Sequence, residues 1–355
     1  MNDYKELLEK FITSVVQQGA SDLHLSEDRI PFIRISGVLV PMINEQVLKR
    51  VDMEGIASVF LTKEAYDQFL ATEEVDFSYT NEKTNARFRG NGYVRQAKLS
   101  FALRLIPQNI KTLQELNLPP ILESFTQLEQ GFFLVVGPVG QGKSTTLASM
   151  IEIINKNSLK HIITIEDPIE YVYAEKKSII DQREVRIDTA DFHTGLHNIF
   201  RQDIDVVLVG EMRGLETIST AVTAAETGHL VFSTLHTNDA AQTIDRIIDS
   251  FPAEQQEQIR LQLAGSLSGI FSQRLVPRIS GGLIPVYELL INNNAVSNLI
   301  RKKRTFEISS VIETSSEQGM IDMNRSLADL VQRGEITIEN AYQYSRNPKN
   351  LEKMI

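Results

Sequence analysis

The feature that most constrains the fold is a glycine-rich octapeptide, GPVGQGKS, at residues 137–144. It matches the pattern GxxxxGK[ST], in which glycines allow a tight turn whose backbone N–H groups point at phosphate oxygens. The octapeptide follows an apolar run, FFLVV at 132–136, and precedes a helical pattern at 145–154. An ordinary glycine-rich turn with a surface lysine would not need this context. The sequence therefore predicts a nucleotide-binding loop between a strand and a helix.

Each residue type in this loop has a chemical reason. The Lys143 side chain is expected to reach the β- and γ-phosphates, and the Ser144 hydroxyl is expected to bind Mg²⁺. The residues predicted to bind the nucleotide here are Gly137, Gly140, Gly142, Lys143, Ser144 and Thr145.

Three more short apolar runs follow the loop, at 161–165 (HIITI), 206–209 (VVLV) and 230–233 (LVFS), with helical patterns between them. Strands that are apolar on both faces are typical of a parallel sheet covered by helices. The second part of the chain is therefore predicted to be an α/β domain.

Potentially catalytic side chains follow these runs. Glu166, Asp167 and Glu170 come at or after the end of the first, and Glu211 comes after the second. The carboxyl ends of parallel strands face the ligand crevice, so these carboxylates are candidates for catalysis, and Glu211 also for holding Mg²⁺. His236 follows the third run, where it could sense the γ-phosphate or the attacking water. The alternatives are solvated loop charges or helix caps for the acids, and a structural role for the histidine.

The N-terminal part has a different pattern. Amphipathic helices are predicted at 7–16 and 53–70, with strand-like runs before and after the second helix. Together they predict a small α+β domain. The strand-like runs are 22–25, 31–35, 38–40, 75–79, 87–94 and 99–106. The proline-bearing segment 107–120 is expected to be a semi-rigid linker, and the tail from about residue 293 is expected to be helical.

Composition excludes several classes of function. The chain of 355 residues has no cysteine, so it has no disulfide, thiolate zinc site or iron–sulfur cluster. Its net charge of −10 disfavours non-specific nucleic-acid binding, and no direct binding to nucleic acid is expected. Neither a signal peptide nor a run of roughly 20 apolar residues is visible, which predicts a cytoplasmic protein that meets a membrane only through a partner.

The motifs together resemble the type II/IV secretion ATPase superfamily. Besides the glycine-rich loop, the similar stretches are 164–171 (TIEDPIEY), 206–213 (VVLVGEMR), 227–238 (TGHLVFSTLHTN) and 20–25 (ASDLHL). The resemblance implies an α/β fold in which a PAS-like N-terminal α+β domain (1–106) and a linker (107–120) precede a RecA-like ATPase core. The core would cover 121–355, with C-terminal helices from about 293.

Within this superfamily the chain is most similar to the retraction ATPases of type IV pili. It lacks the cysteines of the zinc-bearing assembly members, and residues 295–302 (AVSNLIRK) resemble a retraction-type motif close to AIRNLIRE. Ser297 and Lys302 depart from that motif. An ATP-driven retraction motor is therefore the leading interpretation, an accessory or regulatory paralogue is the alternative, and a DNA-translocating motor is disfavoured by the acidic charge.

The resemblance also implies a mechanism. Six identical subunits would form a ring that hydrolyses ATP with Mg²⁺, and Glu170 would activate water while Glu211 holds the metal. Arginines of the N-terminal domain, of which Arg89, Arg95 and Arg104 are the candidates, would stabilise the transition state. The expected partners are an inner-membrane platform protein of the pilus and a paralogous pilus ATPase.

Overall fold

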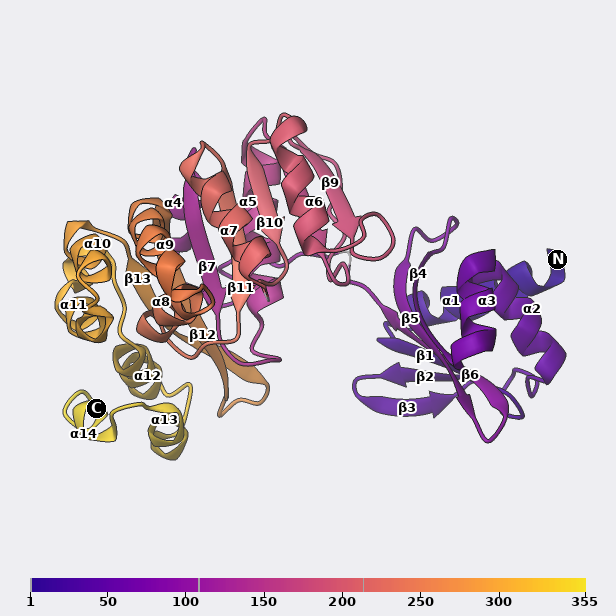
Figure 1. Ribbon diagram of the computed structural model, residues 1–355. Coiled ribbons are helices and arrows are strands. Elements are labelled where there is room, and N and C mark those ends of the chain that lie inside the picture. Colours follow the sequence, from indigo (N-terminus) through magenta and orange to yellow (C-terminus); the bar gives the residue numbers. More distant parts are fainter. Residues whose placement is uncertain (1, 108, 213) are drawn as a thin grey trace. The chain divides into compact units, whose positions relative to one another are not determined.

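Two separate β-sheets organise the chain, one of six strands and one of seven (Figure 1). The computed structural model describes residues 2–107, 109–212 and 214–355. Contacts divide the chain into two units: unit 1 is Met1–Asn109 with Glu170–Val172, and unit 2 is Ile110–Ile169 with Tyr173–Ile355. Arg213, the last residue of the expected 206–213 motif, lies outside the described residues.

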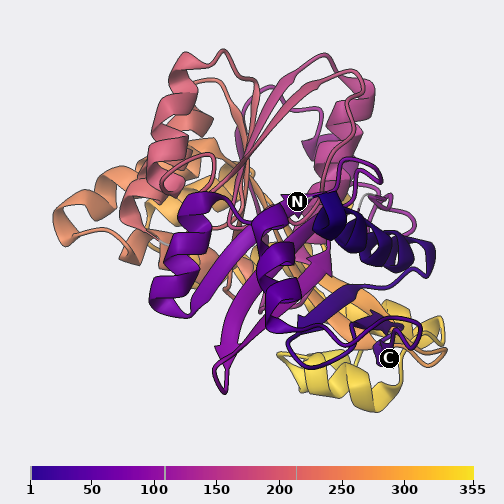
Figure 2. The same cartoon turned by 90° about the vertical axis from the view of Figure 1, so that its right-hand side faces the viewer.

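Unit 1 is an antiparallel sheet in the order β3-β2-β1-β6-β5-β4, with helices over one of its faces (Figure 2). Period-2 alternation explains this arrangement, because Leu23 and Leu103 face the apolar core while their neighbours Asp22 and Arg104 point to the other face. The elements are α1 (Asn2–Gln17), β1 (Asp22–Ser26), β2 (Phe32–Ile35), β3 (Val38–Pro41), α2 (Arg50–Phe60), α3 (Lys63–Thr72), β4 (Glu74–Thr80), β5 (Arg87–Arg95) and β6 (Lys98–Leu105).

The single helix predicted at 53–70 is wrong, because the structure has two helices there. Leu61 ends α2 in an extended conformation, and the Thr62 hydroxyl then accepts a hydrogen bond from the Ala65 N–H as the N-cap of α3. A threonine that satisfies a free first-turn N–H starts a new helix and allows the chain to change direction.

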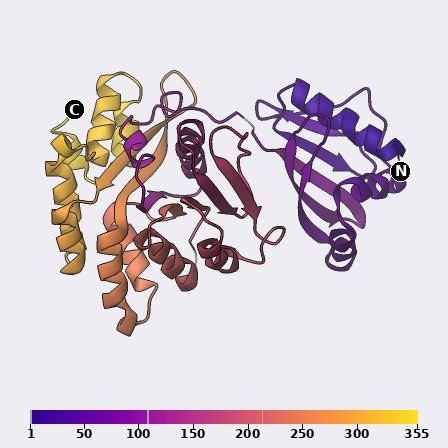
Figure 3. The same ribbon diagram turned by 90° about the horizontal axis from the view of Figure 1, so that it is seen from above.

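Unit 2 is built on a seven-stranded sheet in the order β13-β12-β7-β11-β10-β8-β9. The neighbouring strands are parallel, except for the antiparallel pair β12–β13. In β7, Phe132, Leu134 and Val136 join one core cluster while Phe133 and Val135 join another. The sheet is therefore covered on both faces, as Figure 3 shows. This confirms the α/β fold class.

The bounds of the elements of unit 2 are as follows. They are α4 (Leu122–Phe125), β7 (Gly131–Val136), α5 (Lys143–Asn157), β8 (His161–Glu166), β9 (Ile179–Glu184), α6 (Phe192–Asn198), η1 (Ile199–Arg201), β10 (Val206–Val209), α7 (Leu215–Glu226), β11 (Leu230–Leu235), α8 (Ala240–Asp249), α9 (Ala253–Ser266), β12 (Leu267–Pro277), β13 (Leu283–Ile291), α10 (Asn294–Arg301), η2 (Thr305–Glu307), α11 (Ile308–Thr314), η3 (Ser316–Gln318), α12 (Met323–Gln332), α13 (Ile338–Tyr344) and α14 (Pro348–Leu351).

Most of the segment 107–120 groups with unit 2. Leu113 and Leu118 are buried in one of its core clusters, and the Lys111 carbonyl accepts a hydrogen bond from Ser149 on α5. Leu113 and Leu118 anchor the segment, which a reading of its prolines alone does not predict. Across 2–107, 109–212 and 214–355, no helix combines the length and apolarity needed to cross a bilayer.

Candidate functional site

The glycine-rich loop joins β7 to α5, as predicted. Gly142 has φ +81° and is the N-cap of α5, a left-handed conformation that favours glycine. Gly137 has φ +147°, and a Cβ there would lie 2.3 Å from the carbonyl oxygen of Gln273 on β12. Glycine is thus required at both ends of the turn, by backbone conformation and by the close approach of β12.

Lys143 is the first residue of α5, and its ammonium group turns back into the loop. Its Nζ donates to the carbonyl oxygens of Gly137 and Pro138, each at 2.8 Å. Only 7% of the residue is exposed, and burial lowers the pKa of Lys143, while the negative charge of Glu211 acts in the opposite direction. The ammonium group of Lys143 is therefore held against the glycine-rich loop.

His236 and Glu211 complete a cluster around this lysine. The Nδ1 of His236 lies 3.3 Å from Lys143 Nζ, and its Nε2 lies 3.6 Å from Glu211 Oε2. The sheet order explains these distances, because β11, which ends just before His236, lies between β7 and β10. Three segments far apart in the sequence thus bring a cation, an imidazole and a carboxylate to one edge.

The backbone before Glu211 is fixed by neighbouring strands. The Gly210 N–H donates to the Ile165 carbonyl at 2.8 Å, and the Thr234 hydroxyl donates to the Gly210 carbonyl at 2.7 Å. A Cβ at Gly210 would lie 3.4 Å from the Cα of Glu166. This crowding holds the carboxylate of Glu211 at the strand end, where its side chain is 16% exposed.

The other acidic candidates make internal contacts. Glu166, at the end of β8, is 7% exposed and accepts a hydrogen bond of 2.7 Å from the Thr164 hydroxyl. Asp167 pairs with Arg186 at 3.1 Å. Glu170 is exposed and groups with unit 1. Its role as the base stays a prediction.

The arginine candidates occupy two places on unit 1. Arg89 and Arg104 are directly opposite each other on β5 and β6, and Arg104 donates to Asp22 at 2.9 Å. Burial acts to raise the pKa of Asp22, but hydrogen bonds from Ser21 and Arg104 leave it below its usual value. Arg95 lies about 20 Å from Arg89 along the strand at roughly 3.3 Å per residue. It donates to the Glu27 carbonyl at 3.0 Å. Arg95 is therefore held apart from the pair formed by Arg89 and Arg104.

Residues of β12 that sequence reasoning missed close the other side of the loop. Gln273 accepts from the Thr146 hydroxyl at 2.6 Å and donates to the Gln141 carbonyl at 2.8 Å. The Gln141 side chain in turn accepts from the Leu275 N–H at 2.6 Å. The feature of the sequence that could have identified these residues is a polar triplet, SQR at 272–274, inside an otherwise apolar run.

The donor set suits a metal that arrives with a nucleotide. Ser144 is exposed and follows Lys143 at the start of α5, and Glu211 supplies a carboxylate oxygen to the cluster around Lys143. Among residues 2–107, 109–212 and 214–355, no group of three or more His, Cys, Asp or Glu could hold a metal ion alone. Hydroxyl and carboxylate oxygens are ligands that Mg²⁺ accepts together with phosphates and water. The residues therefore fit Mg²⁺ bound with a nucleotide.

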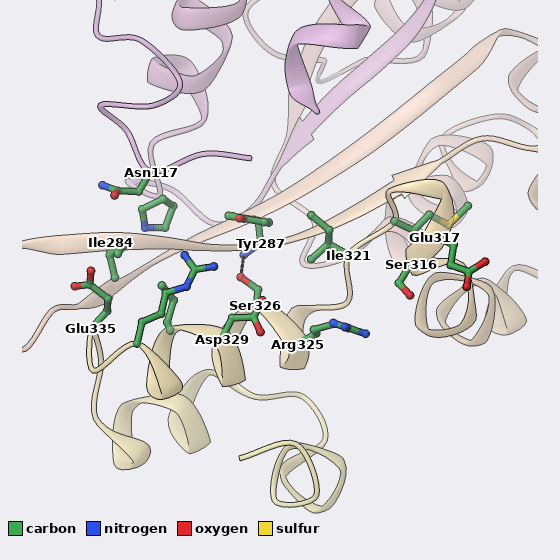
Figure 4. A pocket seen from close by; sticks show the side chains of 14 residues that line it. Asn117, Ile284, Tyr287, Ser316, Glu317, Ile321, Arg325, Ser326, Asp329 and Glu335 are labelled. Atoms are coloured by element: carbon green, nitrogen blue, oxygen red, sulfur yellow. Dashed lines mark hydrogen bonds between the residues drawn. The ribbon is translucent and has the colours of Figure 1, made fainter. Parts of the chain in front are cut away.

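Elsewhere in unit 2, a cavity of about 370 Å³ lies against β13 and α12 (Figure 4). Tyr287 and Ser326 line it and are joined by a hydrogen bond from the Tyr287 N–H to the Ser326 hydroxyl. Burial raises the pKa of Tyr287. None of the lining residues belongs to the glycine-rich loop.

The chain is similar to known proteins over most of its length. The family model described as "Type II/IV secretion system protein" matches residues 2–343. The type IV pilus retraction ATPase PilT of Pseudomonas aeruginosa is 42% identical over 334 residues, which are 94% of this chain and 96% of that protein. The type IV pilus ATPase PilU of the same organism is 38% identical over 348 residues, which are 98% of this chain and 91% of that protein. A crystal structure of the pilus retraction motor PilT with bound ADP matches with a TM-score of 0.89 and 43% identity, covering 96% of this chain and 98% of that one.

Proposed function

The chain belongs to the family of type II/IV secretion system proteins, and we propose that it is the ATP-hydrolysing motor that retracts a type IV pilus. The observation that carries this proposal is the cluster of Lys143, His236 and Glu211 at one sheet edge, in a chain similar to PilT over 94% of its length. The enzyme is an ATPase, and its P-loop binds the nucleotide.

The loop would bind the phosphates first. Its N–H groups and the start of α5 provide a positive site for the β- and γ-phosphates, and Lys143 would exchange its carbonyl partners for phosphate oxygens. Ser144 and Glu211 would hold Mg²⁺, which neutralises charge on the phosphates. Because phosphoryl transfer depends mostly on positioning and charge stabilisation, fixed groups at this edge suit the reaction.

The remaining groups would complete the reaction. Glu170 is the proposed base that orients and activates water, and His236 would report the presence of the γ-phosphate to Glu211. Arg104, with Arg89 beside it, would supply positive charge from the N-terminal domain to a transition state. Glu166 and Asp167 have supporting roles, because each already has a partner within unit 2.

Six copies would form the working ring, and ring assembly would bring N-terminal arginines to nucleotide sites. The proposed partners are the pilus platform protein of the inner membrane and a paralogous pilus ATPase. The motor would act in the cytoplasm and reach the membrane only through the platform protein.

A test is complementation of a deletion strain with the wild-type chain and with Lys143→Ala, scoring pilus retraction directly. We expect retraction only with the wild type. Retraction restored equally by both forms would contradict an ATP-driven role.

Ser297 favours one alternative, an accessory subunit that contributes little force. Its hydroxyl donates to the Ala264 carbonyl on α9 at 2.9 Å and lies 3.0 Å from the Asn292 side-chain oxygen. A serine here joins α10 to α9, whereas an arginine would have to direct its charge elsewhere. ATPase assay of the isolated protein separates the two functions, since substantial turnover supports the motor.

A further inference from the structure

The loop that carries His236 contacts β12. In the order of the sheet, β12 lies on the opposite side of β11 from β10, the strand that precedes Glu211. The Asn238 carbonyl accepts a hydrogen bond of 2.7 Å from Ser272, and the Asn238 side chain accepts one of 2.9 Å from Arg274, both on β12. One residue later, Asp239 is the N-cap of α8. The position of His236 therefore depends on where α8 begins.

A buried carboxylate on β13 fixes that point. Glu288 is 5% exposed, and its Oε1 accepts a hydrogen bond of 3.0 Å from the Ala240 N–H in the first turn of α8. Burial raises the pKa of Glu288 to about 7, although the positive charge of Arg346 acts in the opposite direction. Such a group is costly to bury unless it is paired and hydrogen-bonded.

Arg346, from the segment between α13 and α14, supplies the pairing. Its Nη1 lies 3.4 Å from Glu288 Oε2 and 3.2 Å from Asp239 Oδ2, so one guanidinium group bridges the two carboxylates. The arginine is itself held, because both of its chain neighbours bond to Asn324 on α12. The Ser345 hydroxyl donates to the Asn324 side-chain oxygen at 2.7 Å, and the Asn324 amide donates to the Asn347 carbonyl at 3.0 Å.

We propose that Arg346 and Glu288 are positioning residues for ATP hydrolysis, which join the C-terminal segment to the start of α8 and thereby fix His236 between Lys143 and Glu211. This proposal rests on the ATPase function proposed above. Because Arg346 connects the C-terminal segment to the loop that carries His236, a change in the C-terminal helices should also alter the turnover of ATP.

If Arg346 had only a local structural role, its loss would not lower kcat while leaving KM unchanged. The test therefore compares kcat with KM. We expect Arg346→Gln to lower kcat for ATP hydrolysis about tenfold while KM for ATP changes less than about twofold. Arg346→Lys keeps a positive charge in reach of the carboxylates and should recover part of kcat.

Arg278→Gln is the matched control. Arg278 makes a two-bond ion pair with Glu335 at 2.5 and 2.8 Å, also in the C-terminal part of unit 2, and neither residue contacts the His236 loop in the described structure. The Arg278→Gln variant should therefore keep a kcat near the wild-type value. If Arg346→Gln hydrolyses ATP as fast as the wild type, or loses no more than Arg278→Gln, the proposal is wrong.

A second variant covers the case in which Arg346→Gln fails to fold, as judged by its thermal unfolding. Glu288→Gln retains an oxygen for the Ala240 N–H and removes the charge that pairs with Arg346, so we expect a smaller fall in kcat at unchanged KM. A folded Glu288→Gln with wild-type kcat would contradict the proposal. No hydrolysis by the wild type would contradict the ATPase function itself, and the two failures are thus distinguishable.

Discussion

The two sheets place their polar side chains in opposite ways. In unit 2 both faces of the sheet are apolar and buried, and the reactive groups follow the ends of strands: Glu211 comes after β10, His236 after β11, and Lys143 at the start of α5 after the loop that leaves β7. In unit 1 one face is apolar, and the other carries a row across neighbouring strands, Asp22, Arg104 and Arg89. Chemistry in unit 2 is therefore fixed by the backbone, whereas in unit 1 the arginines Arg89 and Arg104 are exposed on the face opposite the core.

This contrast predicts that changes at the strand ends of unit 2 remove function, while changes on the exposed face of unit 1 only weaken it.

The largest expected effect is that of Lys143→Ala. The variant loses the ammonium group that would bind the phosphates, and we expect ATP affinity to fall at least about 100-fold, since charge-assisted hydrogen bonds are the strong ones. Isothermal titration calorimetry measures the affinity of each variant for ATP. Lys156→Ala, at the other end of α5, is the control and should bind normally. Unchanged affinity in Lys143→Ala would overturn the P-loop assignment.

Next in size is Glu211→Ala. This variant keeps the loop and should still bind ATP, but turnover should fall about 1,000-fold because a group fixed for the transition state is missing. Phosphate release in single-turnover and steady-state assays measures this. Glu226→Ala, at the exposed end of α7, is the matched control. Near-wild-type phosphate release by Glu211→Ala would refute its role.

A smaller effect concerns stability and pH. The pKa of Glu288 is about 7 in the folded chain, above the usual 4.5, so the folded state binds more protons than the unfolded state between these values. The contribution of this group is present below pH 4.5 and is lost as pH rises through 7, a loss of up to about 3 kcal/mol. Urea unfolding of wild type and Glu288→Gln at pH 5 and pH 8 measures it. Identical pH dependence in both forms would show that Glu288 is not the source.

The smallest expected effect is that of Arg104→Ala in unit 1. The side chain is 73% exposed, so its ion pair with Asp22 should contribute less than about 1 kcal/mol to the free energy of unfolding. Turnover of the assembled protein should nevertheless fall about tenfold, because a positive charge near the transition state is lost. Arg95→Ala, at the far end of the same hairpin, is the comparison. A larger loss of turnover in Arg95→Ala than in Arg104→Ala would reverse the order of the candidates.

Local patterns predicted the parts of the fold that depend on local chemistry. The strand and helix around the glycine-rich loop are confirmed as β7 and α5, because loop geometry and apolar runs leave few alternatives. The strands β12 and β13 were not predicted, since an apolar run that contains polar residues, as both of these do, does not by itself reveal its secondary structure. Likewise, Thr62 divides one amphipathic pattern into two helices without changing its period.

The site divides in the same way. Motif spacing led to Lys143, Glu211 and His236, each of which follows an apolar run. Gln273 and Arg346 contact this region only because the chain returns to it, through β12 and through the segment after α13. No pattern within a short window links residues so far apart, so only the tertiary structure identifies them.

The position of Lys143 has a consequence for product release. Its ammonium donates to two carbonyl oxygens of its own loop. An incoming anion therefore competes with these intramolecular acceptors as well as with water. Inorganic phosphate offers one small group of oxygens, whereas a triphosphate chain engages the loop N–H groups, the start of α5 and the lysine together. Inorganic phosphate alone should therefore compete for Lys143 less well than a triphosphate chain does, and it should inhibit the enzyme only weakly.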